Sequence, residues 1–223
     1  MKDSIQVKIN EQDAVTAFIY PADKKTRARV TLLLGHGAGA DQTSNFMVSF
    51  AIGLQARGID VVTFNFLYTE QGRRAPDRND KLESAYRAAI AAVKTDRRLK
   101  QNRLMIGGKS MGGRIASQVA AEGVEDLAGL VFLGYPLHPP GKPEKLRIEH
   151  LPKIHKPMLF VQGARDSFGT PDELQPVIKK IKASLYSIEG GDHSFTVAKR
   201  WPVSQEQVYE AAQEEIARWV KAI

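Results

Sequence analysis

The residues with the clearest chemical signature lie at positions 108–112, where a serine stands between glycines in the pattern Gly-x-Ser-x-Gly. The apolar residues 104–107 before this pattern predict a buried strand, and the residues from Met111 onward predict a helix. A serine on such a sharp strand-to-helix turn presents its hydroxyl group at the end of a sheet. Glycine two residues before and two residues after it avoids a collision there. Ser110 is therefore the candidate nucleophile.

The same residues also resemble the end of a phosphate-binding loop, whose pattern is Gly-x-x-x-x-Gly-Lys-Ser/Thr. That pattern requires a glycine at position 103, and the residue there is Arg103. Residues 104–107 are apolar, as in a strand, rather than an open loop around phosphates. The phosphate-binding interpretation therefore fails.

A nucleophilic serine needs a base to accept its proton and an acid to hold that base in the correct tautomer. Asp166 and His193 follow Ser110 in this order, and each comes just after a predicted buried strand. The carboxyl ends of parallel strands meet at one edge of a sheet, so we expect all three side chains at that edge. Asp192 is a rival acid, but its position next to His193 in the sequence is a poor one for reaching Nδ1.

Acyl transfer also needs two backbone N–H donors for the negatively charged oxygen that forms during the reaction. We predict that one donor is Met111, the residue after the serine, and that the other is Ala38 in the small-residue loop 35–40. His36, in the same loop, is interpreted as a brace for the loop rather than as a second base.

The remaining histidines raise the alternative of a metal site, because His138, His150 and His155 lie in one segment. Their spacing matches no zinc pattern, and no carboxylate is paired with them. The chain has no cysteine, which excludes a thiolate nucleophile and a cysteine-ligated metal. We expect no metal and no cofactor.

Buried strands and amphipathic helices alternate along the chain. Strands are predicted at about residues 5–9, 15–20, 30–34, 61–64, 104–107, 129–134, 158–161 and 183–188. Helices are predicted at about residues 44–57, 82–93, 111–122, 170–180 and 204–220, and residues 67–78 are predicted as a polar loop. Alternation of this kind implies right-handed crossovers. The predicted fold class is α/β: a mainly parallel sheet of about seven or eight strands with helices on both faces.

Length and composition limit the classes of function. The 223 residues are most simply one domain over positions 1–223. The net charge of +7 suggests nucleic acid as a partner, but the basic residues are spread along the chain and mixed with acidic ones, so we expect none. No apolar run has the length of a signal peptide or a membrane span, so we expect a cytoplasmic protein without a membrane partner. The oligomeric state is left open.

Four segments carry a resemblance to a known family: residues 35–40, 65–78, 108–113 and 135–141. Through them nearly the whole chain resembles the α/β-hydrolase superfamily, close to its dienelactone-hydrolase-like group. The segments resemble a subgroup of uncharacterised bacterial hydrolases whose eukaryotic relatives include a subunit of a chromatin acetyltransferase complex. The chain departs from dienelactone hydrolase itself, whose nucleophile is a cysteine.

The resemblance and the three residues together favour a serine hydrolase that cleaves an ester, thioester or related acyl bond of a small soluble substrate through an acyl-enzyme. A different class of function stays open, namely a binding or scaffolding protein that keeps the fold without turnover. Residues 135–156 are short and proline-rich, so we expect a rim around the site rather than a large lid domain.

The candidate substrate contacts are Tyr68, Tyr135, Leu137, Arg73 and Arg74, because the loops after the fourth and sixth strands face the carboxyl edge of the sheet. Both loops carry more basic than acidic residues. Their arginines either gather anionic acyl substrates or only pin the loops through ion pairs, and such mixed-charge loops favour the second interpretation.

Overall fold

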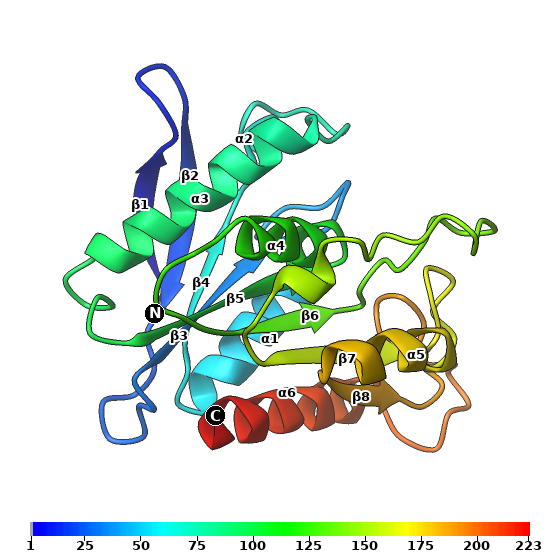
Figure 1. The fold of residues 1–223 in the computed structure, drawn as a ribbon. Coiled ribbons are helices and arrows are strands. Elements are labelled where there is room, and N and C mark those ends of the chain that lie inside the picture. The colour runs from blue at the N-terminus through cyan, green and yellow to red at the C-terminus, as the bar shows by residue number, and fades with distance from the viewer. Residues whose placement is uncertain (1) are drawn as a thin grey trace.

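The computed structural model describes residues 2–223, which form an eight-stranded sheet in the order β1-β2-β4-β3-β5-β6-β7-β8 (Figure 1). The strands are β1 (Asp3–Lys8), β2 (Ala14–Tyr20), β3 (Val30–Gly35), β4 (Asp60–Phe64), β5 (Arg103–Lys109), β6 (Leu127–Leu133), β7 (Met158–Gly163) and β8 (Ser184–Ile188). β2 is antiparallel to β1 and to β4, and every other pairing is parallel. The predicted hairpin at the sheet edge and the mainly parallel sheet are confirmed.

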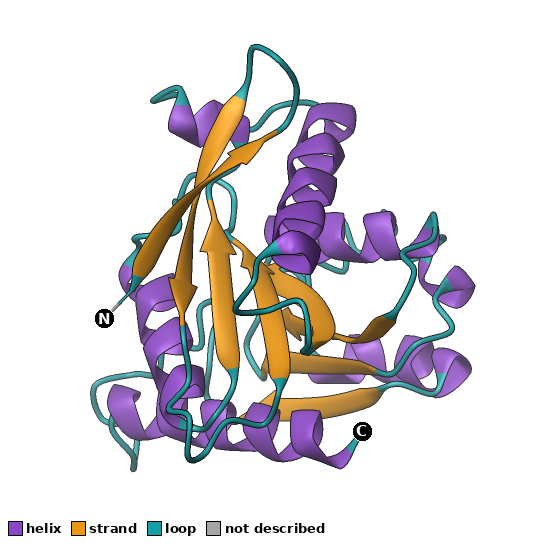
Figure 2. Ribbon diagram, turned by 90° about the vertical axis from the view of Figure 1, so that its left-hand side faces the viewer, coloured by secondary structure: helices purple, strands orange, loops and turns teal. Residues whose placement is uncertain are grey.

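The parallel strands β3 and β4 at the centre are buried along their whole length because helices cover both faces of the sheet (Figure 2). The helices are α1 (Asn45–Ala56), α2 (Leu67–Glu70), α3 (Asn79–Thr95), α4 (Met111–Ala121), α5 (Pro171–Ile181) and α6 (Gln205–Ala222), with the 3-10 turn η1 (Leu151–Lys153). Helices α1 and α6 pack on one face, and α3, α4 and α5 on the other. The core is thus two apolar layers separated by the sheet.

Local signals set several of these boundaries. Thr170 and Ser204 each accept a hydrogen bond from the backbone N–H three residues on, and Glu173 and Gln207 bond back to the cap residue. The prediction that residues 67–78 form only a polar loop is wrong, since α2 occupies the first four of them. The helix forms there because Leu67 and Tyr68 are buried against the core.

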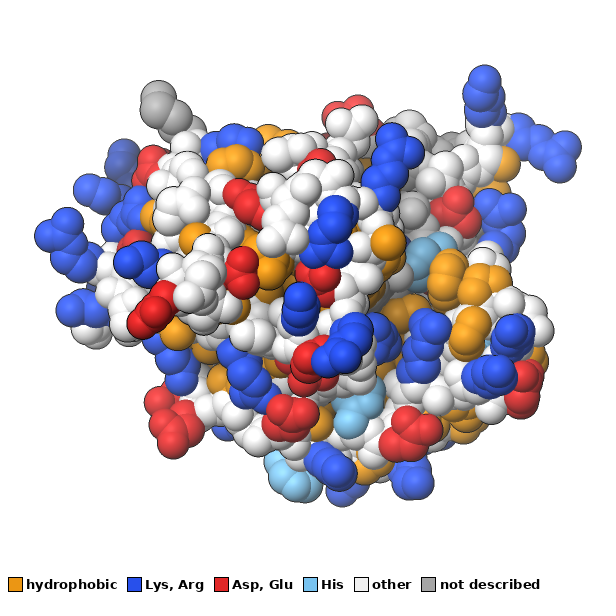
Figure 3. Space-filling view, turned by 90° about the horizontal axis from the view of Figure 1, so that it is seen from above, with side chains coloured by type: hydrophobic (Ala, Val, Ile, Leu, Met, Phe, Trp, Pro, Cys, Tyr) orange, Lys and Arg blue, Asp and Glu red, His pale blue; other side chains and the backbone are white. Residues whose placement is uncertain are grey.

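Charge is mixed rather than segregated on the face that Figure 3 draws. Figure 3 shows basic and acidic side chains interspersed over one face of the molecule. A stripe of one sign, which would mark a nucleic-acid-binding face, is not seen on that face. Within residues 2–223, no helix combines the length and apolar character needed to cross a membrane.

Candidate active site

Ser110 lies between the end of β5 and the first residue of α4, with φ of 50° and ψ of −114°. A non-glycine residue with positive φ is strained, and such strain is often found at functional sites. A Cβ atom at Gly108 or at Gly112 would overlap the carbonyl oxygen of Gly35, the last residue of the adjacent strand β3. The two glycines are therefore required because the turn packs directly against a neighbouring strand.

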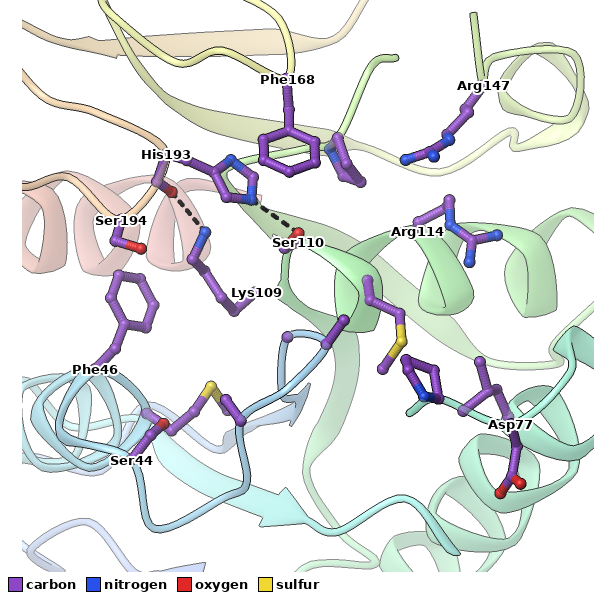
Figure 4. Close-up of a pocket in the computed structure, with 18 of the residues that line it drawn as sticks. Ser44, Phe46, Asp77, Lys109, Ser110, Arg114, Arg147, Phe168, His193 and Ser194 are labelled. Carbon is purple, nitrogen blue, oxygen red and sulfur yellow. Dashed lines mark hydrogen bonds between the residues drawn. The ribbon is translucent and has the colours of Figure 1, made fainter. Parts of the chain in front are cut away.

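The structure brings Ser110, His193 and Asp166 into one hydrogen-bonded chain (Figure 4). His193 Nε2 lies 2.8 Å from Ser110 Oγ, and His193 Nδ1 lies 2.7 Å from Asp166 Oδ2. The three residues follow the carboxyl ends of β5, β8 and β7, which is the edge expected from the sequence. In this geometry the carboxylate holds the proton on Nδ1, so that Nε2 can accept the serine proton.

Asp166 is almost fully buried, and hydrogen bonds compensate for its lost hydration. Its Oδ1 accepts from the Phe168 N–H at 2.8 Å, and its Oδ2 accepts from Gln162 Nε2 at 2.8 Å. Gln162 also binds Tyr135 and Gly169 through their backbones. Gln162 was not among the residues predicted from the sequence, although a glutamine near the end of an otherwise apolar strand is a usable signal.

Two further side chains position His193. The ring of Phe168 stacks on the imidazole at 4.2 Å between centroids, and Lys109 Nζ donates to the His193 carbonyl oxygen at 2.5 Å. Burial lowers the pKa of Lys109 to about 8, while the nearby Asp166 and Asp192 carboxylates oppose that change. Lys109 therefore connects the strand-to-helix turn at Ser110, here called the elbow, to the loop that carries His193.

Asp192, the rival acid, has a different task in the structure. Its Oδ1 accepts from the backbone N–H groups of Ser194 and Thr196, both at 2.8 Å. These bonds shape the loop that carries His193. The His193 ring bonds to Asp166 instead.

Ala38 and Met111, the expected oxyanion donors, line the same pocket as Ser110. Within the described chain, neither of their backbone N–H groups donates to a protein acceptor. For Met111 this is expected, because the first N–H groups of a helix have no partner within the helix. His36 is fully buried beside them, and burial lowers its pKa. His36 Nδ1 lies 2.9 Å from the Gly37 carbonyl oxygen, and His36 Nε2 accepts a hydrogen bond from the Phe66 N–H. His36 therefore braces this loop.

The pocket in front of Ser110 has a volume of about 500 Å³, within the range of small-molecule sites. Its apolar wall includes Phe46, Met47, Leu82, Met111 and Phe168. Its cationic side chains are Lys109, Arg114 and Arg147, and Asp77 lies at its edge. The pocket therefore combines an apolar wall with several positive charges.

Three predicted substrate contacts do not line this pocket and are corrected. Tyr68, Tyr135 and Leu137 are at most 1% exposed and belong to the apolar core. The Tyr135 hydroxyl donates to the Arg147 carbonyl oxygen at 2.8 Å. Tyr68 lies in α2, and Tyr135 and Leu137 lie in the loop after β6. All three segments are at the correct edge of the sheet, but the side chains turn inward because the core beneath buries their apolar surface.

The predicted contacts Arg73 and Arg74 also lie outside the pocket lining, and this prediction is corrected as well. Arg73 forms an ion pair with Asp77 at 2.7 Å, and Arg74 is exposed. The arginines that line the pocket are Arg114 and Arg147. Arg114 could have been found from its spacing, because a residue four positions after Ser110 lies one helical turn away from it.

The histidines of residues 135–156 do not converge on one another. His138 faces Glu173, with Nε2 3.3 Å from Oε1, and His150 lies 2.7 Å from Ser117 Oγ on α4. Burial lowers the pKa of His150 to about 4, and the nearby Arg114 adds to this effect. Both histidines therefore attach the rim segment to helices of the core.

Solved structures share this fold over nearly the whole chain. An alpha-beta serine hydrolase homologue from Coxiella burnetii is 17% identical, with a TM-score of 0.76 over 98% of this chain and 97% of that chain. A serine hydrolase without a lid from Xanthomonas campestris is 18% identical, with a TM-score of 0.75 over 98% and 94%. Dienelactone hydrolase from Anabaena variabilis is 20% identical, with a TM-score of 0.71 over 96% and 95%. At these identities the likeness shows the fold alone.

The sequence itself also matches a known family. The description of that family is alpha/beta hydrolase domain, and the match covers residues 28–221. This range contains the elbow at Ser110 and the two loops that carry Asp166 and His193. The expected fold class, without a large lid domain, is confirmed, and the chain belongs to the alpha/beta hydrolase family.

Proposed function

We propose that this protein is a serine hydrolase that cleaves a carboxylic ester, thioester or related acyl bond of a small soluble substrate. The observation that carries the proposal is the hydrogen-bonded chain from Asp166 through His193 to Ser110, which opens onto a pocket with an apolar wall. Strained φ and ψ at Ser110 support the same conclusion, since the surrounding structure must hold the hydroxyl in this position.

In the proposed first half-reaction, Ser110 Oγ attacks the substrate carbonyl carbon while His193 Nε2 accepts the hydroxyl proton. Asp166 stabilises the resulting imidazolium and keeps its Nδ1 proton in place. The N–H groups of Ala38 and Met111 donate to the oxygen that becomes negatively charged. The tetrahedral intermediate then collapses, and the leaving alcohol or thiol takes the proton from His193, which leaves an acyl-enzyme.

In the second half-reaction, water replaces the leaving group. His193 accepts a proton from the water as its oxygen attacks the acyl-enzyme, and the same two N–H groups stabilise the second intermediate. Collapse of that intermediate returns the proton to Ser110 and releases the carboxylic acid. Because residues 135–156 form a rim without a helix beyond the short turn η1, the proposed substrates are short acyl compounds rather than lipid aggregates.

The comparisons support the class of reaction. Proteins with this fold include chains described as serine hydrolases. They also include a dienelactone hydrolase, whose name gives a lactone, that is a cyclic ester, as its substrate. The narrower kinship with bacterial hydrolases related to a chromatin acetyltransferase subunit stays a proposal that rests on the sequence resemblance.

Labelling with a fluorophosphonate probe tests the proposal. Such a probe reacts with an activated serine, so the wild-type protein should be labelled and Ser110→Ala should not. Ser84→Ala, which removes an exposed serine on α3, is the matched control and should label as the wild type does. An unlabelled wild type, with the Ser84→Ala variant equally inert, would support the binding or scaffolding alternative instead.

A further inference from the structure

We propose that Arg114 and Arg147 form a subsite for a carboxylate group carried by the substrate. The preferred substrates would then be short esters or thioesters with a second, anionic end. This inference rests on the proposed hydrolase function, because it concerns the pocket in front of Ser110.

Both arginines are positioned beside the nucleophile. Arg114 is on α4, and its backbone N–H donates to the Ser110 carbonyl oxygen at 3.0 Å. Arg147 comes from the rim segment between β6 and β7. Figure 4 shows the two side chains next to each other, on the side of Ser110 away from Lys109 and Phe46. The pocket therefore has a cationic end one helical turn from the serine.

The partners of these two arginines differ from those of the other half-buried arginines. Arg27, Arg57 and Arg87 are half-buried, and each forms an ion pair with a carboxylate. Arg114 and Arg147 are also half-buried, and within residues 2–223 neither is within ion-pair distance of a carboxylate. The two unpaired side chains are also the two that line the pocket.

Neutral groups hold both residues without neutralising them. The Arg114 guanidinium donates to Gln118 Oε1 at 3.0 Å and to Asn79 Oδ1 at 3.3 Å. Arg147 is fixed through its backbone, since its N–H donates to Leu137 and its carbonyl oxygen accepts from the Tyr135 hydroxyl, both at 2.8 Å. Tyr135 and Leu137, which were predicted to contact the substrate directly, therefore support the subsite from beneath.

The acidic groups around the pocket leave this positive charge largely uncompensated. Asp77 lines the pocket, but it is paired with Arg73. Among the described residues, Glu83 is not within ion-pair distance of Arg114. Burial and the neighbouring Arg147 both lower the pKa of Arg114, so the charged form is less favourable there than in water. An anion between the two guanidinium groups would remove that penalty.

A carboxylate suits this arrangement because a guanidinium presents paired N–H donors that match two carboxylate oxygens. The short distance along α4 from Ser110 to Arg114 limits how far the anionic end lies from the scissile bond. A few carbon atoms between the two groups fit a pocket of about 500 Å³. The structure therefore favours monoesters of small dicarboxylic acids or small esters with a carboxylate on the alcohol part.

Two matched pairs of substrates test the inference. The first pair is the nitrophenyl ester of butanoic acid and the nitrophenyl monoester of butanedioic acid. The second is the butanoate ester of 4-hydroxybenzoate and that of its methyl ester, which places the carboxylate on the alcohol part. We expect kcat/KM to be about 10- to 100-fold higher for the anionic member of at least one pair, as hydrogen bonds to a charged group allow.

Arg114→Gln and Arg147→Gln should each bring the anionic-to-neutral ratio toward one, and Arg147→Lys should keep part of it. Arg74→Gln, which removes an exposed cation outside the pocket, should keep the wild-type ratio and is the matched control. A wild-type ratio near one for both pairs overturns the subsite while leaving the hydrolase function intact. So does stronger competition by inorganic phosphate than by butanedioate, because the site would then take phosphoryl groups.

A binding measurement keeps the inference testable if turnover is absent. In the Ser110→Ala variant, calorimetry should detect the monomethyl ester of butanedioic acid binding more tightly than methyl butanoate, and Arg147→Gln should abolish the difference. Failure of fluorophosphonate labelling with this binding intact would overturn the hydrolase proposal alone. Equal binding of the two esters would overturn the subsite.

Discussion

Two buried aspartates at opposite ends of the sheet make the same number of hydrogen bonds but have different partners. Asp60 begins β4 at the amino edge, and it accepts from the Ala22 N–H, Arg27 Nε and Asn102 Nδ2. Asp166 follows β7 at the carboxyl edge, and it accepts from Phe168, Gln162 and His193. Both side chains are at most 1% exposed.

The difference lies in the third partner of each aspartate. A guanidinium keeps its charge in proteins and does not accept a proton. In Arg27 the Nη2 atom donates to the Arg98 carbonyl oxygen, so this chain of hydrogen bonds ends at the backbone. An imidazole ring can instead accept and return a proton during a reaction, and the second ring nitrogen of His193 faces Ser110. Burial and hydrogen bonding of a carboxylate therefore do not identify a reactive site. What distinguishes the reactive site is a partner of the carboxylate that can transfer a proton and that faces a pocket.

The largest expected effect is on catalysis at the carboxyl edge. Asp166→Asn should lower kcat for a neutral ester by about 10³- to 10⁴-fold, because the amide no longer holds His193 in the correct tautomer. Steady-state kinetics measure the loss, and circular dichroism checks that the variant is folded. If Asp192→Asn lost this activity and Asp166→Asn kept it, the assignment of the acid would be reversed.

At the amino edge the expected effect is on stability. Asp60→Asn leaves Arg27 without its charge partner, and we expect the free energy of unfolding to fall by about 2–3 kcal/mol, reduced from the fully buried case because Arg27 is partly exposed. The activity of the folded fraction should not change. The control is Arg57→Gln, which breaks an ion pair whose carboxylate, Glu214, is exposed. It should lower the free energy of unfolding, measured with urea, by less than about 1 kcal/mol. Equal losses would contradict the comparison.

The smallest expected effect is a pH dependence from Lys109, the buried cation at the carboxyl edge. Its pKa is about 8 in the folded protein and 10.5 when unfolded, so the unfolded chain binds more protons between these values. Stability therefore rises with pH from about 8 to 10.5, by on the order of 1–3 kcal/mol relative to Lys109→Met. Urea unfolding of both proteins across this range measures the difference, and parallel curves would show that Lys109 titrates normally.

Features that depend on short stretches of chain could be predicted from the sequence. The helix cap at Thr170 and the capping box at Ser204 can each be recognised from four residues, and in the structure both positions form capping boxes. The turn at Ser110 is recognised from five residues, although the crowding that requires its two glycines comes from Gly35 on the neighbouring strand β3. The order of strands and helices followed from periodicity, which reports burial directly.

Predictions about loop side chains failed where direction mattered. Tyr68, Tyr135 and Leu137 were placed at the correct edge of the sheet but turned into the core. Tyr135 and Leu137 lie in a loop, and Tyr68 lies in a helix of four residues, so none of them belongs to a segment long enough to show a periodicity. Only packing therefore decides whether each side chain faces the pocket or the interior.

By itself the sequence determined the fold class and the set Ser110, Asp166 and His193, since the ends of parallel strands must share one edge and each residue follows such an end. Only the tertiary structure decided that Gln162 and Phe168 hold this set, and that Arg114 and Arg147 meet beside the serine. These contacts join segments far apart in the chain. Burial removes water from polar groups, which then need other hydrogen-bond partners or an opposite charge. Which groups are buried together depends on the packing of the whole molecule.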